Sequence, residues 1–285
     1  MAEFATDQAE GLRRLFGRDF VRIVTLTSSK AGLGKTTAIL NLAAALAKAG
    51  KNVMVLDENS GRGNLGSMIG ARHAHDLLDV VRQGKSLEEV MIAGPQGISI
   101  LQAAQADLSM DEEERLVDCM SHVARPADVV LVDTAAGSPG HLLSLSAQEI
   151  VVVLSPEGSS ITDAYALIKM MNMHYAKRHF RILVTRAKNA EEARAVFDNM
   201  SRVARRYLAI SLDFMGHVPL DAQLRQASRL KLPVVEAFPL SASSSSFRHI
   251  ADSIVRWPCP AHDEMSLGDF FQHLIQGSRL CAARA

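Results

Sequence analysis

The stretch SSKAGLGKTT, residues 28 to 37, most strongly constrains what this chain can fold into. It follows a β-branched run, VRIVTLT, and leads into an Ala- and Leu-rich segment with a helical pattern. Gly32 and Gly34 allow backbone N–H groups to close around an anion, while Lys35 supplies an ammonium group and Thr36 a hydroxyl for Mg²⁺. A strand, a loop and a helix in this order therefore predict a phosphate-binding loop.

Short apolar runs alternate with longer helical patterns along the rest of the chain. The runs are apolar on both faces, which is typical of parallel strands covered by helices. Seven of them are expected to be strands: 21 to 27, 52 to 57, 98 to 101, 128 to 133, 150 to 154, 180 to 185 and 212 to 218. We predict an α/β, doubly wound fold with a mainly parallel sheet of about seven or eight strands and helices on both faces.

Composition excludes several classes of protein. The 31 basic and 31 acidic residues give a formal charge of zero, so nothing in the balance demands a nucleic acid or an anionic membrane as partner. No apolar stretch reaches the roughly 20 residues that span a bilayer. Cys119, Cys259 and Cys281 are far apart and lack metal-type spacing. We expect a soluble cytoplasmic protein without disulfides.

Two predicted strands end on an acidic residue. The run VMVL leads into Asp57, and DVVLVD ends on Asp133, which is followed by the small residues TAAG. Ligands of doubly wound sheets lie beyond the carboxyl ends of the strands, so both carboxylates should lie near Gly34. Together with the Thr36 hydroxyl, Asp57 and Asp133 are the expected Mg²⁺ residues.

The phosphate-binding loop departs from the general pattern GxxxxGK[ST], because Ser29 replaces the first glycine and Lys30 follows it. KxGxGKT resembles the deviant Walker A motif of the MinD/ParA class of ATPases. The resemblance implies ATP as the cofactor, Lys35 on the β- and γ-phosphates, and Lys30 reaching the nucleotide of the opposite subunit in a homodimer. It also implies that a continuous set of residues binds the nucleotide: Ala31, Gly32, Leu33, Gly34, Lys35, Thr36 and Thr37.

In MinD-like proteins the strand after the loop helix ends D-x-D, and the second Asp orients the attacking water. The matching residues here are Asp57, Glu58 and Asn59. An amide can hydrogen-bond water but cannot accept a proton, so we expect slow ATP turnover and a long-lived ATP-bound dimer. Glu58 should point the other way from a strand end.

Further strings resemble the FlhG/FleN branch of MinD-like ATPases, which control flagellar number. They are TDAYALIK within SPEGSSITDAYALIKMM, then FRILVTRAKNAEEARAVF, LDFMGHVPLDAQLRQAS, VVEAFPLSASSSSFRHIA and WPCPAHDEMSLGDFFQHL. The resemblance covers nearly the whole chain and implies that Thr185, Arg186, Pro219 and Asp221 flank the adenine. It also implies restraint of flagellar genes through a FleQ-type transcription activator and contacts with flagellar switch-complex proteins.

The N-terminal stretch DQAEGLRRLF, residues 7 to 16, resembles the DQAxxLR element with which FlhG-type proteins stimulate FlhF, a GTPase related to the signal-recognition particle. A helix would place Ala9, Leu12 and Phe16 on an apolar stripe. The residues expected to activate the partner are Asp7, Gln8, Ala9, Leu12 and Arg13. A second interpretation stays open, in which this segment is an amphipathic arm that lies on its own domain.

The tail MSLGDFFQHLIQGSRL also has two interpretations. Its apolar residues have helical spacing: Leu267, Phe270, Phe271, Leu274 and Ile275. They suit either a membrane-targeting helix at the inner face of the cell membrane or a helix packed on the core. We accordingly predict three parts: an N-terminal arm (1 to 20), an ATPase domain (21 to 256) and an amphipathic tail (257 to 285).

Other signals are weaker. His73, His75 and Asp76 lack the ligand spacing of a metal site and fit a surface loop. Basic residues recur near helix faces: Arg202, Arg205, Arg206, Arg225, Arg229 and Lys231. ParA relatives use such a face on DNA, but the neutral net charge favours a solvated face or a protein-partner surface. A ParA-like partitioning ATPase remains the alternative function. A kinase or metal-transfer ATPase is disfavoured because the chain has no CxxC pair.

Overall fold

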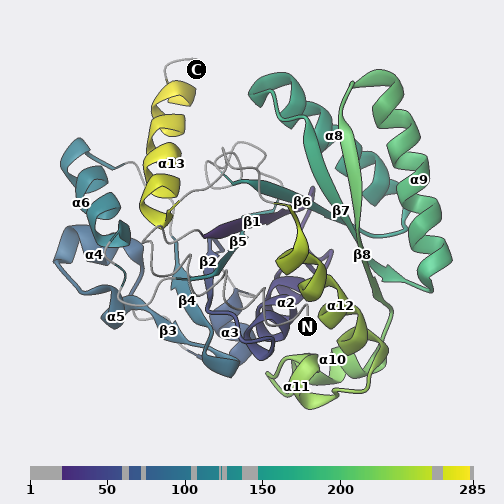
Figure 1. Cartoon of the computed structure of the whole chain (residues 1–285), viewed down its shortest axis with the longest axis horizontal. Coiled ribbons are helices and arrows are strands. Elements are labelled where there is room, and N and C mark those ends of the chain that lie inside the picture. The colour runs from purple at the N-terminus through teal and green to yellow at the C-terminus, as the bar shows by residue number, and fades with distance from the viewer. Residues whose placement is uncertain are drawn as a thin grey trace, which may run out of the picture.

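The computed structural model describes residues 21–59, 64–71, 75–103, 108–121, 123, 127–136, 147–258 and 266–282. Within these ranges eight strands form one sheet, in the order β3-β4-β2-β5-β1-β6-β7-β8. The strands are β1 (Arg22–Thr27), β2 (Val53–Asp57), β3 (Ile92–Ala93), β4 (Ser99–Gln102), β5 (Val129–Asp133), β6 (Glu149–Leu154), β7 (His179–Ala187) and β8 (Ser211–Pro219). Figure 1 shows this sheet crossing the molecule between its helices.

The predicted fold class is confirmed. Every neighbouring pair of strands from β4 to β8 is parallel, and only β3 pairs with β4 in the antiparallel direction. All seven predicted strands are present, with ends that differ by one or two residues. The eighth strand, β3, has two residues, too few to give a periodic pattern in the sequence.

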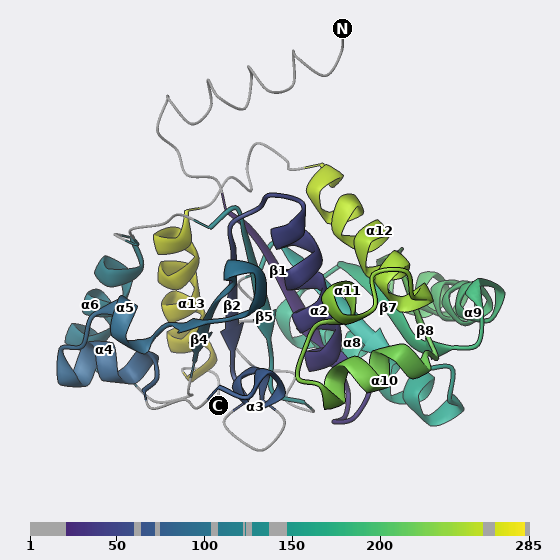
Figure 2. The same ribbon diagram turned by 90° about the horizontal axis from the view of Figure 1, so that it is seen from below.

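Helices cover both faces of the sheet. They are α2 (Lys35–Lys48), α3 (Leu65–Ile69), α4 (Leu77–Gln83), α5 (Leu87–Val90), the 3₁₀ turn η1 (Pro95–Gly97), α6 (Met110–Ser121), α8 (Gly158–Tyr175), α9 (Ala190–Tyr207), α10 (Ala222–Arg229), α11 (Val234–Ala237), α12 (Ala242–Arg256) and α13 (Leu267–Ala282). Helices α2, α10, α11 and α12 gather over one face, as Figure 2 shows. The other face carries α4, α6 and α13 over one half and α8 and α9 over the other.

The strands are apolar on both faces because each face packs against helices. On β5, Val129 and Leu131 belong to the cluster around α2, while Val130 and Val132 belong to the cluster around α6 and α13. Burying such side chains stabilises the fold by roughly 1.5–3 kcal/mol each. The sheet is therefore fixed from both sides, and its strand tips are held in register.

Two local features of the sequence fix helix ends. The Glu112 carboxylate accepts a hydrogen bond from the Ser109 backbone N–H at 2.8 Å, and the Ser109 hydroxyl accepts one from the Glu112 backbone N–H at 3.4 Å. This pair of hydrogen bonds is a capping box at the start of α6. Gly50 has φ of 81°, which suits a glycine directly after the end of α2.

The tail had two interpretations, and in the structure it forms a helix that packs on the core. Helix α13 lies beside α6, and the side chains of Leu267, Phe270, Phe271 and Ile275 are buried. Phe270 and Phe271 meet edge to face at 5.4 Å. These residues are therefore part of the core rather than a stripe facing a membrane. The side chain of Leu274 lies outside the described residues.

Several predictions concern residues that are not described, among them the N-terminal arm at 1 to 20, His73 and Cys259. The three-part division of the chain stays a prediction. This stretch was predicted to be a surface loop; in the structure Asp76 caps the start of α4 and His75 contacts Asp79 at 3.2 Å. Across the described ranges, the structure contains no helix with the length and apolar character of a membrane span.

Candidate nucleotide site

The loop between β1 and α2 has the backbone geometry of an anion cradle. Gly32 and Gly34 have φ of 82° and 84°, which other residues rarely adopt. Gly34 is the N-cap of α2, and no side chain caps the helix there. The first N–H groups of α2 therefore lack intrahelical partners and lie at the positive end of the helix dipole.

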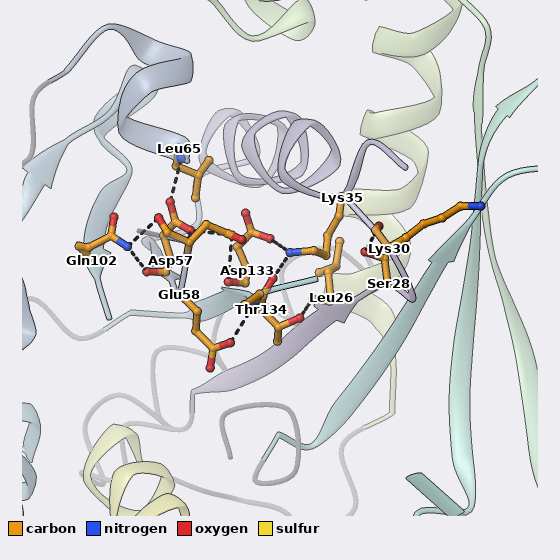
Figure 3. A network of polar contacts seen from close by, with 12 residues as sticks. Leu26, Ser28, Lys30, Lys35, Asp57, Glu58, Leu65, Gln102, Asp133 and Thr134 are labelled. Carbon is orange, nitrogen blue, oxygen red and sulfur yellow. Dashed lines mark hydrogen bonds and ion pairs between the residues drawn. The ribbon is translucent and has the colours of Figure 1, made fainter. Parts of the chain in front are cut away.

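Lys35 links this loop to the tips of two neighbouring strands. Its ammonium group donates to the Asp133 carboxylate and to the Thr134 carbonyl, and its side chain is only 6% exposed. Asp133 on β5 pairs in register with Asp57 on β2. Figure 3 shows the Lys35, Asp57 and Asp133 side chains grouped at the same edge of the sheet. The predicted convergence of loop and strand tips is thus present.

Asp57 holds the segment that follows β2. One carboxylate oxygen accepts hydrogen bonds from the Asn59 backbone N–H and side-chain amide, both at 2.9 Å. The other accepts from the Leu65 backbone N–H, at the start of α3, at 2.7 Å. On the far side, the Gln102 amide donates to the carbonyls of Asp57 and Asn59 at 2.7 and 2.9 Å. Asn59 therefore points inward at Asp57, and Gln102 is a supporting residue that the sequence analysis missed.

Glu58 points away from Asp57, as expected for the next residue after a strand (Figure 3). Its backbone N–H donates to the Asp133 carbonyl at 2.9 Å, and its carboxylate accepts from the Ala135 N–H at 3.0 Å. Burial raises the pKa of this carboxyl to about 7, against the lowering effect of the Ala135 hydrogen bond. Glu58 therefore ties the tip of β2 to the segment after β5.

The acidic side chains suit a divalent cation. Burial raises the pKa of Asp133 and of Asp57, opposed by the Lys35 charge at Asp133 and by the Leu65 N–H at Asp57. Asp133 Oδ2 is buried and has no hydrogen-bond partner among the described residues. Thr36 lies close enough to Asp133 to lower the pKa of its carboxyl. The described residues contain no group of three or more His, Cys, Asp or Glu side chains that could hold a metal. The described side chains alone therefore do not complete a metal site. The geometry fits Mg²⁺ held at Asp133 and Thr36, with phosphate oxygens as the remaining ligands.

Lys30 extends away from Lys35 (Figure 3). Its ammonium group lies 3.1 Å from the Ser159 hydroxyl and 3.5 Å from the Asp163 carboxylate, both in the first turns of α8. The Lys30 side chain is 41% exposed, whereas Lys35 is nearly buried. The two lysines of the loop therefore lie in different environments. Asp163 belongs to the TDAYALIK string, so this string and the extra lysine are in contact.

A cavity of about 330 Å³ opens beside the loop and gathers the four residues predicted to flank a base, namely Thr185, Arg186, Pro219 and Asp221. The Thr185 hydroxyl hydrogen-bonds to the Leu33 carbonyl at 2.7 Å and the Leu154 carbonyl at 3.2 Å. The Arg186 guanidinium donates to the Gly32 carbonyl. The tip of β7 is thus fastened directly to the phosphate loop.

Other cavity residues were missed from the sequence. Leu224 and Arg225 come from α10, and Phe247 comes from α12. No motif marks them, because their place in the cavity depends on how the helices after β8 fold back over α2. Asp221 is also the N-cap of α10 and accepts from the Gln223 N–H at 2.8 Å and the Ser243 N–H at 3.0 Å. Its carboxylate therefore has a structural role as well.

A glycine loop that opens a helix, with a lysine and two strand-tip carboxylates beside it, is the arrangement of P-loop nucleotide-binding proteins. Comparison with known proteins agrees. The family described as CobQ/CobB/MinD/ParA nucleotide binding domain matches residues 24–234. The chain belongs to this family.

Relatives with descriptive names extend the comparison. The chain is 36% identical over 263 residues to the antiactivator FleN of Pseudomonas aeruginosa, covering 90% of this chain and 94% of that one. It is 28% identical to the flagellum site-determining protein YlxH of Helicobacter pylori, covering 82% of each chain. Among solved structures, the MinD cell division protein of Aquifex aeolicus matches with a TM-score of 0.67 and 24% identity, over 84% of this chain and 98% of that one.

Proposed function

We propose that this protein is an ATP-dependent dimerising regulator of flagellar number or placement. The single observation that carries the proposal is the Lys35, Asp57 and Asp133 array beside the glycine loop, in a chain similar to FleN and YlxH. The array supports binding of a triphosphate with Mg²⁺, and the relatives' names support the flagellar role.

Each part of the site has a place in nucleotide binding. The Gly32–Gly34 loop and the first N–H groups of α2 bind phosphate oxygens, and Ala31, Leu33 and Thr37 complete the loop. Lys35 moves its ammonium from Asp133 toward the β- and γ-phosphates, which leaves Asp133 and Thr36 for Mg²⁺. Asp57 acts from the outer shell, because both of its oxygens already accept backbone N–H groups. The cavity beside Thr185, Arg186, Pro219 and Asp221 takes the base.

Lys30 is the residue that would couple ATP binding to dimerisation. In one copy it is held by Ser159 and Asp163, and it is exposed enough to leave them. In a face-to-face dimer, Lys30 of each copy would reach the γ-phosphate of the other, where a second ammonium stabilises the charge of the triphosphate. ATP binding would thereby favour the dimer, and ATP hydrolysis would favour its dissociation into single copies.

Hydrolysis is expected to be slow. The residue in position to orient the attacking water is an amide, Asn59, and its NH₂ group donates to Asp57. An amide offers no proton acceptor, and such assistance is typically worth roughly 10²- to 10⁴-fold. Glu58 points to the other side of the strand tip, and its carboxylate accepts a hydrogen bond from the Ala135 N–H.

The output would be stimulation of an FlhF-type GTPase through Asp7, Gln8, Ala9, Leu12 and Arg13 of the N-terminal arm. Similarity to a protein named antiactivator supports a second output, restraint of a FleQ-type transcription activator. Flagellar switch-complex proteins are further expected partners.

The test is GTP hydrolysis by a purified FlhF-type GTPase with the full chain, with a chain lacking residues 1 to 20, and with a Gln8→Ala variant. We expect stimulation by the full chain and its loss in both variants, with ATP binding unchanged in all three. Equal GTPase rates with and without residues 1 to 20 would contradict the activator role and leave an ATP-binding member of the family.

A further inference from the structure

A buried glutamine, Gln102, stands behind the nucleotide site at the end of β4. Its residue is 5% exposed, and it lies on the far side of Asp57 from Lys35, as Figure 3 shows. Asp57 and Gln102 are paired in register on the parallel strands β2 and β4. The Gln102 amide is therefore a buried polar group one strand away from the array of Lys35, Asp57 and Asp133.

The orientation of this amide follows from its two neighbours. Gln102 Nε2 lies 2.7 Å from the Asp57 carbonyl oxygen and 2.9 Å from the Asn59 carbonyl oxygen. Both neighbours are acceptors, so the amide must present its NH₂ group to them. Gln102 Oε1 is buried and has no hydrogen-bond partner among the described residues. The side chain thus donates twice and leaves its own oxygen unpaired there.

The sheet alone gives no reason for this glutamine. The Ala103 backbone N–H already donates to the Asp57 carbonyl at 2.8 Å and continues the ladder between β4 and β2. Burial of an amide whose oxygen is unpaired costs free energy that burial of an apolar side chain of the same size does not. The bond that the sheet does not require is the one to Asn59, which lies beyond the end of β2.

The backbone of residues 57 to 59 is held from both sides. On the side of β5, the Glu58 N–H donates to the Asp133 carbonyl at 2.9 Å. On the side of β4, Gln102 holds the Asn59 carbonyl. With its backbone fixed between two strands, residue 59 changes the direction of its side chain only by rotation about its own side-chain bonds. In the structure, that side chain points at Asp57.

We propose that Gln102 is a positioning residue for ATP hydrolysis, which acts by fixing the backbone of residue 59. The inference rests on the proposed function, in which position 59 lies beside the attacking water. Gln102 contacts the backbone and not the Asn59 side chain, so it holds an aspartate at this position equally well. A group that handles water loses much of its effect when it is displaced by about 1 Å, so the fixed backbone supports kcat and leaves ATP affinity unchanged.

The first measurement is amide hydrogen exchange in the nucleotide-free protein, which does not depend on ATP. Gln102→Met keeps an unbranched side chain and removes both donors. We expect the Asn59 N–H to exchange about tenfold faster in this variant, and the Val55 N–H of β2 to stay within about twofold. The control is Gln148→Met, which removes an amide that accepts from the Ile23 N–H at the opposite end of the sheet. This control should leave the Asn59 exchange rate unchanged.

The second measurement combines Gln102→Met with changes at position 59. In the Asn59→Asp background, Gln102→Met should lower kcat for ATP about tenfold and leave KM within about twofold. In the Asn59→Ala background no water-handling side chain remains to be positioned, so Gln102→Met should leave kcat within about twofold. A purely structural role for Gln102 would lower kcat in both backgrounds alike.

Either of two results would overturn the proposal. An Asn59 exchange rate that is equal in Gln102→Met and the unchanged chain would show that Gln102 does not hold this backbone. An equal fall of kcat in both backgrounds, or no fall in either, would show that Gln102 does not act through residue 59. Absence of ATP binding by the unchanged chain would instead contradict the proposed function, and this inference with it. Gln102→Leu, which also lacks the donors, takes the place of Gln102→Met if that variant fails to fold.

Discussion

The phosphate side and the base side of the nucleotide site are built from different interactions. On the phosphate side, a nearly buried ammonium and three buried carboxyls lie at the tips of β2 and β5, and burial raises the pKa of all three acids. On the base side, the Thr185 hydroxyl and the Arg186 guanidinium donate to backbone carbonyls and fasten β7 to the loop beside a partly apolar cavity. The first side depends on the balance of buried charges, and the second on shape and on hydrogen bonds to backbone carbonyls.

Because of this difference, substitutions on the phosphate side should cost more free energy than substitutions on the base side. A charge lost from the phosphate side leaves a buried opposite charge without compensation, which commonly costs about 3–5 kcal/mol. A hydroxyl lost from the base side costs roughly 1 kcal/mol.

The largest effect is expected for Lys35→Ala. The variant removes the ammonium that contacts Asp133 and that we assign to the phosphates, so ATP affinity and hydrolysis should fall on the order of 100-fold or more. Calorimetric titration with ATP and Mg²⁺ measures the affinity. Lys169→Ala, on the exposed face of α8, is the control and should bind ATP normally. Unchanged ATP affinity in Lys35→Ala would show that Lys35 does not bind the phosphates, which contradicts the role assigned to this side of the site.

The next effect concerns Glu58 and pH. The pKa of Glu58 is raised to about 7 from 4.5, so the folded chain holds this proton between those values. Its contribution to stability is present below about pH 4.5 and is lost as the pH rises through 7. Relative to Glu58→Gln, the unchanged protein should lose on the order of 2–3 kcal/mol between pH 5 and 8.

Urea unfolding of the nucleotide-free protein, in a metal chelator, at pH 5, 6.5 and 8 measures the Glu58 effect. The glutamine keeps an oxygen that can accept the Ala135 N–H, so the hydrogen bond is matched between the two proteins. Stability curves that run parallel over the whole range would show that Glu58 titrates normally.

Asn59→Asp is expected to speed ATP hydrolysis about several-fold or more, by placing a proton acceptor beside the attacking water. The structure adds a reason: a carboxylate cannot donate to Asp57, and repulsion at about 2.9 Å would turn it outward. Single-turnover hydrolysis is the measurement, with Asn59→Ala as the control that removes the amide and adds no acid. An unchanged kcat in Asn59→Asp would show that this position does not handle water.

The smallest effect is expected on the base side. Thr185→Val keeps the shape and removes the hydrogen bonds to the Leu33 and Leu154 carbonyls, so ATP affinity should fall only a few-fold, with kcat nearly unchanged. Thr162→Val, at an exposed position of α8, is the matched control. A loss in Thr185→Val as large as that in Lys35→Ala would erase the distinction between the two sides.

Much of the phosphate side could be predicted from the sequence because its residues follow one another in the chain. Gly32, Gly34 and Lys35 form a local motif, and parallel strands bring Asp57 and Asp133 to one edge. For Glu58, strand geometry predicted only the direction in which the side chain points. Its bond to Ala135 depends on two segments about 77 residues apart in the chain, which no local pattern encodes.

The base side and the tail show the same limit. Thr185 and Asp221 were found through family resemblance, whereas Phe247 and Leu224 reach the cavity only through the packing of α10 and α12. The spacing of Phe270 and Phe271 suited a membrane helix and a core helix equally, because an apolar stripe does not specify what it faces. Packing against α6 decides between the two for the structure described.

The central claim is that Lys30 of one copy completes the phosphate side of another. Light scattering of the 30.9 kDa chain with ATP and Mg²⁺ tests it most directly, beside Lys30→Ala and the control Lys169→Ala. The account predicts twice that mass for the unchanged chain and the control, and a single copy for Lys30→Ala. A dimer of Lys30→Ala that forms at the same concentration and binds ATP with the same affinity would contradict it.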